Sequence, residues 1–249
     1  MRFLVFQHLD VEHPGIFRRY FGERGIVWDT VELDRGDAIP NDLTAYDALA
    51  VFGGPMDVWE ENRYPWLITE KAAIRHWVRE LKRPYLGVCL GHQLLADALG
   101  GAVSKMPAPE VGIADVDLTE AGKSDPLMKG IPLRTRVLEW HGAEVSALPP
   151  DSVILARNDT CTVQSFRAGQ HAYGLQYHVE IESETVAEWN KVPAYAAALA
   201  QLLGPGGQAL LEQRAQMEMP LLNELASTVC ENFQSVVAGT VAAPPPIAF

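Results

Sequence analysis

The stretch Leu86-Gly87-Val88-Cys89-Leu90-Gly91-His92-Gln93 decides how the chain is expected to fold. It joins an apolar strand over residues 84–88 to a helix over 91–99, with Cys89 alone in the tight turn between them. The glycines two residues before and after Cys89 let the strand and the helix approach where a side chain would clash. This is the pattern of a nucleophile elbow with Cys in the position of Ser. It predicts a cysteine held out at the carboxyl edge of a sheet.

The turn also predicts reactivity at Cys89. The N-terminus of a helix favours a thiolate over a thiol. The backbone N–H of Leu90, between Cys89 and that helix, is available to bind an oxyanion. The alternative is a plain strand–helix turn with a buried cysteine, because free Cys often serves as a small apolar core residue.

Outward from the elbow, strands alternate with helices. Strands are predicted over 2–9, 26–33 and 46–52, and helices over 16–24 and 66–81. This alternation favours parallel pairing. Residues 111–179 hold strand-like pieces at 111–118, 136–141, 152–157, 162–166 and 172–179 with no strong helix between them, which favours antiparallel pairing. Helices follow over 182–203 and 207–237. We therefore expect a three-layer α/β fold with a mostly parallel central sheet and an antiparallel extension.

No linker or repeat divides the sequence. One domain is expected over residues 1–240, with its core at 2–185 and C-terminal helices at 182–237, followed by a frayed, Pro-rich tail at 241–249.

Composition excludes several classes of protein. The chain has 249 residues, 48% of them apolar, and a net charge of −12, which is a globular balance and not that of a disordered chain. An acidic chain argues against nucleic-acid and anionic-membrane partners. Three widely spaced cysteines suggest a reducing compartment. No apolar run reaches the length of a membrane span, and the N-terminus is predicted to be a strand and not a signal peptide. The cytoplasm is the expected location.

A second chemical motif lies far downstream, in Gly174-Leu175-Gln176-Tyr177-His178-Val179-Glu180. If this segment is a strand, side chains two residues apart project from the same face, so His178 and Glu180 point the same way. A histidine beside the cysteine can act as base and then as acid, and a carboxylate beyond it can orient the ring. The alternative is an edge histidine next to a solvated glutamate.

Together with two further motifs, these segments resemble the class I glutamine amidotransferases, which use a Cys-His-Glu triad. Gly53-Gly54-Pro55-Met56 resembles the GGP loop of that family, and Trp140-His141-Gly142 resembles its W-H-G segment. The four motifs occur in the family's order over about residues 2–185. The sequence 53-GGPMDVWEENRYPWL-67 and the segment Glu110–Gly112 are most similar to the stand-alone type 1 branch, which is related to the glutaminase domain of GMP synthetase.

The resemblance implies a flavodoxin-like fold and a role for each matching residue. Cys89 would attack the side-chain amide of glutamine, His178 would relay the proton and Glu180 would orient His178. The N–H groups of Gly54 and Leu90 would form the oxyanion hole. Substrate would be bound by Gln93, His141, Gly142 and Glu110. The resemblance implies no cofactor and no metal, and the possible partner it implies is a synthetase or acceptor subunit.

The sequence departs from the family pattern at two positions. Val179 replaces the usual proline between the triad His and Glu, and Ala143 replaces an aspartate that holds the α-amino group of the substrate in many members. Two alternatives to glutamine hydrolysis therefore stay open. One is a stand-alone γ-glutamyl peptide or amide hydrolase, and the other is a non-catalytic regulatory subunit that keeps the fold.

Overall fold

The computed structural model describes residues 1–241, so all but the first residue of the tail expected at 241–249 lies outside the described residues. Within residues 1–241 the strands form one nine-stranded sheet in the order β2-β1-β3-β4-β9-β8-β7-β5-β6. The strands are β1 (Arg2–Gln7), β2 (Val27–Glu32), β3 (Ala48–Val51), β4 (Tyr85–Val88), β5 (Ala102–Leu118), β6 (Arg134–Ala147), β7 (Ser152–Arg157), β8 (Ser165–Ala168) and β9 (Ala172–Leu175).

The sheet has two parts that meet at β9. Strands β2, β1, β3, β4 and β9 pair in parallel, whereas β9, β8, β7, β5 and β6 pair antiparallel in succession. The α/β fold with a parallel core and an antiparallel extension is thus confirmed, and the extension is as large as the parallel part. Because β9 lies directly beside β4, the segment after β9 reaches the carboxyl edge where Cys89 follows β4.

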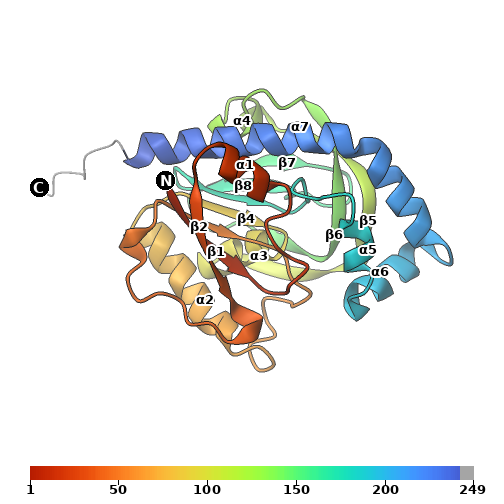
Figure 1. Cartoon of the computed structure of the whole chain (residues 1–249), viewed down its shortest axis with the longest axis horizontal. Coiled ribbons are helices and arrows are strands. Elements are labelled where there is room, and N and C mark those ends of the chain that lie inside the picture. The colour runs from red at the N-terminus through yellow and green to blue at the C-terminus, as the bar shows by residue number, and fades with distance from the viewer. Residues whose placement is uncertain (242–249) are drawn as a thin grey trace, which may run out of the picture.

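Helices cover both faces of the sheet (Figure 1). The helices are α1 (Phe17–Glu23), α2 (Trp66–Arg75), α3 (Leu90–Ala98), α4 (Glu120–Lys123), α5 (Thr185–Trp189), α6 (Pro193–Leu203) and α7 (Gly207–Val241). A wider π-helical segment, His76–Glu80, continues α2, and single 3₁₀ turns lie at Leu33–Arg35, Leu43–Ala45 and Pro126–Met128.

The core follows from the strand alternation. Phe3 and Val5 of β1 pack with α1 and α7 on one face, whereas Leu4 and Phe6 pack with α2 and α3 on the other. A third apolar cluster lies among α5, α6 and α7, around Trp140 of β6. No described helix is long and apolar enough to cross a membrane.

Several predicted elements differ in the structure, and the strands expected over 111–118 and 136–141 are the longer β5 and β6. The helix expected over 182–203 is two helices, because Pro193 starts α6 at a position where a proline N–H is not needed. The strand expected over 172–179 ends at Leu175, since Gln176 donates its backbone N–H to Gln164 outside the ladder. The strand expected over 162–166 is β8 instead, which starts at Ser165.

Candidate active site

The nucleophile elbow is present at the end of β4. Cys89 has φ 51° and ψ −105°, a conformation that a non-glycine residue adopts only under constraint. Its backbone N–H donates to the carbonyl of Leu175 at 2.8 Å, which ties the turn to β9. A Cβ on Gly87 would lie 2.4 Å from the backbone of Gly91, and one on Gly91 would lie 2.1 Å from the carbonyl oxygen of Val51. The two glycines therefore permit the close approach that the sequence predicted.

His178 and Glu180 meet although neither is in a regular strand, which corrects the strand-face argument. The backbone of His178 makes an isolated bridge to Leu138 of β6, and its N–H donates at 2.8 Å. Glu180 Oε1 lies 2.7 Å from Nδ1 of His178. Glu180 Oε2 accepts the N–H of Val179 at 3.0 Å, a bond that a proline at position 179 could not donate. Two donors thus hold the Glu180 carboxylate.

The charge on His178 is set by its neighbours. Burial lowers the pKa of this histidine, but Glu180 and a Cys89 thiolate outweigh it and raise the pKa well above the usual value. The Cys89 thiol itself lies 3.9 Å from the carbonyl oxygen of Trp140. A histidine with a raised pKa near a cysteine is suited to act as an acid and a base in thiol chemistry.

A cavity of about 430 Å³ opens at Cys89. Four more of the predicted site residues line it: Gly54, Gln93, His141 and Gly142. Glu110 is not among the lining residues and instead contacts His141. Nε2 of Gln93 donates to the carbonyl of Ala143 at 3.1 Å, so this residue also holds the wall of the cavity.

The loop that carries Gly54 rests on a buried ion pair that no sequence motif indicates. His8 Nδ1 donates to the carbonyl of Gly53 at 2.8 Å, and His8 Nε2 lies 2.9 Å from Glu70. Both side chains are fully buried. A Cβ on Gly54 would lie 3.0 Å from the Cβ of His8 and 2.8 Å from the side chain of Leu90. The loop is thus packed between His8 and the first residue of α3.

The His8–Glu70 pair should make the free energy of unfolding depend on pH. Burial lowers the pKa of His8, but Glu70 and the Gly53 carbonyl outweigh it, with a smaller contribution from Glu12, and the pKa is raised. The pKa of His8 is thus higher in the folded state than in the unfolded state. The stabilisation of the fold by the His8–Glu70 pair is therefore complete below about pH 6.5, and it is lost as the pH rises through the raised pKa of His8.

We expect Glu70→Gln to lower the free energy of unfolding by about 2 kcal/mol at pH 6, and by less at higher pH. Urea unfolding of both chains from about pH 6 to 9 measures this difference. An equal loss at every pH would contradict the assignment of the charge to His8. Glu144→Gln, a substitution outside the pair, is the matched control.

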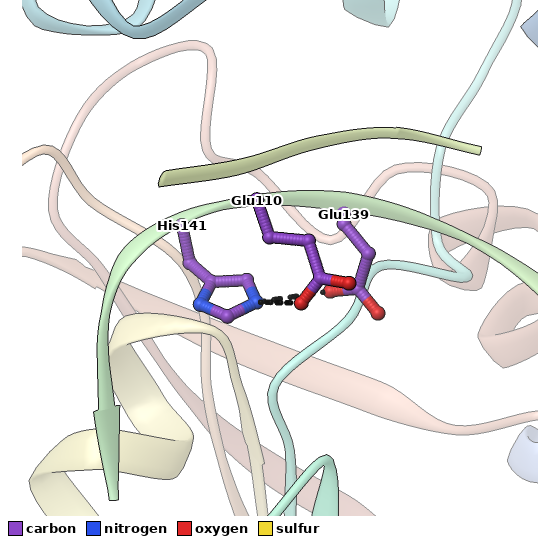
Figure 2. A group of neighbouring side chains, drawn as sticks. All are labelled: Glu110, Glu139 and His141. Atoms are coloured by element: carbon purple, nitrogen blue, oxygen red, sulfur yellow. Dashed lines mark ion pairs between the residues drawn. The ribbon is translucent and has the colours of Figure 1, made fainter. Parts of the chain in front are cut away.

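A second charged group lies behind the cavity wall, where Glu110 of β5 faces Glu139 and His141 of β6 (Figure 2). His141 Nε2 lies 3.2 Å from a carboxylate oxygen of each glutamate. Burial lowers the pKa of His141, but the two carboxylates outweigh it and raise the pKa to about 10. Of these residues, Glu139 was not singled out in the sequence, because only the strand pairing brings it to the site.

Glu12 is a further buried carboxylate that was not singled out in the sequence. It accepts a hydrogen bond from Tyr195, which lines the cavity. Burial raises the pKa of Glu12 to about 7, against the opposing effects of His178 and Tyr195. The only indication in the sequence is that Glu12 comes shortly after the first strand, and so near the edge of the sheet where Cys89 is expected.

Other histidines do not gather into a site. His92 is buried against Phe166, with ring centroids 4.9 Å apart, and burial lowers its pKa to about 3. His8 is engaged in the pair above, Asp10 binds Arg35 on the surface, and His13 accepts the N–H of Gly15. The spacing of His8, Asp10 and His13 gives little support for a metal site, and in the structure the three side chains have separate partners.

Comparison with known proteins points to one family. The family model described as glutamine amidotransferase class-I matches residues 15–188. The chain is 31% identical to the glutamine amidotransferase-like protein YfeJ of Salmonella typhimurium over 192 residues, which cover 75% of this chain and 78% of that protein. It is 26% identical to gamma-glutamyl peptidase 3 of Arabidopsis thaliana over 181 residues, 70% of each chain. Identity to the GMP synthase of Aeropyrum pernix is 31%, over 68% of this chain and only 31% of that enzyme.

Solved structures agree with this result. A glutamine amidotransferase from Thermotoga maritima superposes with a TM-score of 0.83 at 28% identity, covering 95% of this chain and 98% of that one. A glutamine amidotransferase from Methylobacillus flagellatus gives a TM-score of 0.81 at 25% identity, covering 94% of each chain.

Proposed function

The chain belongs to the class-I glutamine amidotransferase family, and from this premise we propose that Cys89, His178 and Glu180 form a catalytic triad that hydrolyses the side-chain amide of glutamine. The observation that carries the proposal is the constrained Cys89 at the cavity, together with a His178 that Glu180 holds at 2.7 Å and whose pKa Cys89 helps to raise. Nucleophile, base and orienting group are thus in the order that thioester chemistry needs.

The reaction proceeds in two steps. The Cys89 thiolate attacks the amide carbon, and the N–H groups of Gly54 and Leu90 stabilise the oxyanion. The C–N bond then breaks as His178 gives its proton to the departing ammonia, which leaves a γ-glutamyl thioester. In the second step His178 takes a proton from water, which attacks the thioester. The C–S bond then breaks and glutamate leaves, which restores the Cys89 thiolate beside the His178 that holds the proton from water.

Ala143 favours a second candidate, the hydrolysis of γ-glutamyl peptides or amides. An alanine offers no carboxylate to the α-amino group of a substrate. The Ala143 carbonyl already accepts from Gln93 at 3.1 Å and faces His141 Nδ1 at 3.0 Å. The relative named gamma-glutamyl peptidase 3 supports the same alternative.

If the substrate is glutamine, the chain would supply ammonia to a synthetase partner. Several relatives are named as one subunit of GMP synthase, which supports such a partner. The non-catalytic alternative has only Ala143 and Val179 in its favour.

Glutamate release by the purified chain tests these alternatives. We expect turnover of glutamine or of γ-glutamyl dipeptides, and a preference for the dipeptides would assign the stand-alone hydrolase. A chloroketone analogue of glutamine should label Cys89 rapidly and saturably. Cys161 and Cys230 are internal controls, because burial raises the pKa of these thiols to about 12 and about 11. No turnover, together with labelling of Cys89 no faster than of the two controls, would leave only the regulatory subunit.

The three unpaired cysteines bear on the cellular location of the protein. Cys89, Cys161 and Cys230 are all unpaired and buried. A cysteine nucleophile and unpaired thiols fit a reducing environment, so we propose the cytoplasm.

A further inference from the structure

We propose that Glu110, Glu139 and His141 bind one divalent transition-metal ion of the Zn²⁺ class behind the wall of the cavity. The group lies outside the proposed triad and oxyanion hole, although Glu110 and His141 are among the residues predicted to bind substrate. Figure 2 shows the three side chains turned toward one another from two neighbouring strands.

The spacing fits ligands around one ion. His141 Nε2 lies 3.2 Å from Glu110 Oε2 and 3.2 Å from Glu139 Oε2, and the three atoms lie within 4.8 Å of one another. Nitrogen and oxygen ligands bound at about 2.1 Å lie about 3.0–3.4 Å apart when their angle at the metal is between octahedral and tetrahedral. The two distances from His141 Nε2 to the carboxylates fall within this range.

The Nδ1 side of the His141 ring is already held as it would be in a metal-bound histidine. His141 Nδ1 lies 3.0 Å from the carbonyl oxygen of Ala143, which can only accept, so Nδ1 carries a hydrogen. Nε2 is therefore directed at the two carboxylates. Metal-bound histidines generally donate their other ring N–H to a carbonyl or carboxylate in this way. The space between Nε2 and the two carboxylates can hold either a proton on Nε2 or a cation bound by all three groups.

Glu139 is the independent observation that points to an ion. Its side chain is fully buried, and within residues 1–241 neither of its carboxylate oxygens has a hydrogen-bond donor in suitable geometry. A proton on His141 would leave one net negative charge in this buried group. A divalent ion with a neutral imidazole would leave none, and a buried carboxylate without a donor needs such compensation.

The surroundings of Glu110 fit a metal ligand as well. Asn158 donates to one of its carboxylate oxygens at 2.6 Å and Gln164 donates to the other at 3.0 Å. Such second contacts fix the orientation of a ligand before the ion arrives. The side chain of Glu110 is 12% exposed, and His141 lines the cavity, so an ion can reach the group from solvent. One imidazole and two carboxylates suit Zn²⁺, Co²⁺ or Mn²⁺ better than a thiol-seeking ion.

The test is a titration of the full chain with Co²⁺ after treatment with a chelator. We expect a visible absorption band that saturates at one ion per chain and is displaced by Zn²⁺. Glu139→Gln should weaken binding by about 100-fold, and Asn158→Ala, which removes only a contact to Glu110, by about 10-fold. Glu144→Gln lies on the same strand outside the group and should bind Co²⁺ like the parent chain.

Two further measurements keep the outcomes separate. The band should persist in Cys89→Ala, because the catalytic thiol is not a ligand, and far-UV circular dichroism should show that the variants are folded. The proposal is overturned by the absence of stoichiometric binding, by equal affinity in the parent and Glu139→Gln chains, or by loss of the band in Cys89→Ala. In each of these cases the group is an ion pair in which His141 carries the proton.

Discussion

Replacing Cys89 with alanine is expected to lower the turnover number for the best substrate by about 10⁴-fold or more, because no other group in the cavity can form the thioester. Cys161 and Cys230 are buried away from the cavity lining, so they cannot take over the reaction. The measurement is glutamate release at saturating substrate. Residual activity within about tenfold of the parent chain would exclude a cysteine mechanism.

The same prediction extends to the residues that act with Cys89. His178→Gln should be about as inactive as Cys89→Ala, and the double variant should be no worse than either, since groups that act as a unit are strongly non-additive. A double variant about 10³-fold below both single ones would mean that the two side chains act in separate steps. The free energy of unfolding, measured in parallel, separates a lost reaction from a lost fold.

Gly91→Ala is expected to lower the free energy of unfolding by about 4 kcal/mol, and with it the melting temperature by about 10 °C. A Cβ at this position would lie 2.1 Å from the carbonyl oxygen of Val51. That oxygen belongs to the backbone of β3 in the centre of the sheet, so it cannot turn away as a flexible side chain would. The start of α3 and the elbow would have to move together.

A matched glycine shows what the substitution costs without the clash. Gly22 lies in α1, and a Cβ there would meet no atom within 4 Å. Gly22→Ala should be neutral or stabilise the protein by up to about 1 kcal/mol. Thermal unfolding of the two variants side by side gives the comparison. If Gly91→Ala melted like Gly22→Ala, the close packing of α3 against β3 would be wrong.

Local patterns in the sequence predicted the parts of the fold that depend on neighbours along the chain. The elbow at Cys89 could be predicted because glycine spacing and an apolar run lie within eight residues. The parallel strands could be predicted because β1, β3 and β4 are short, apolar and buried on both faces. The sequence predicted one helix over 182–203 where the structure has α5 and α6, although Pro193 is a typical first residue for the second helix.

Groups that assemble across the sheet could not be predicted from the same patterns. Glu139 meets Glu110 only because β6 pairs with β5, and a lone glutamate on a strand gives no sign of its partner. His8 and Glu70 come from the end of β1 and from α2, and nothing in either segment indicates the other. His178 and Glu180 were paired correctly for a partly wrong reason, because the contact is made in a bend and not along a strand.

The pairing of β4 with β9 has a consequence for the order of events during folding. Cys89 is anchored to Leu175 by its backbone N–H, and the His178 segment follows that strand directly. The chain between the two strands holds the long β5–β6 pair together with β7 and β8. Such a non-local parallel contact closes slowly, because the loop entropy must be overcome before the pairing stabilises it. Activity should therefore return last in refolding, after the antiparallel strand pairs have formed. The rate at which activity recovers would then report the rate at which β4 pairs with β9.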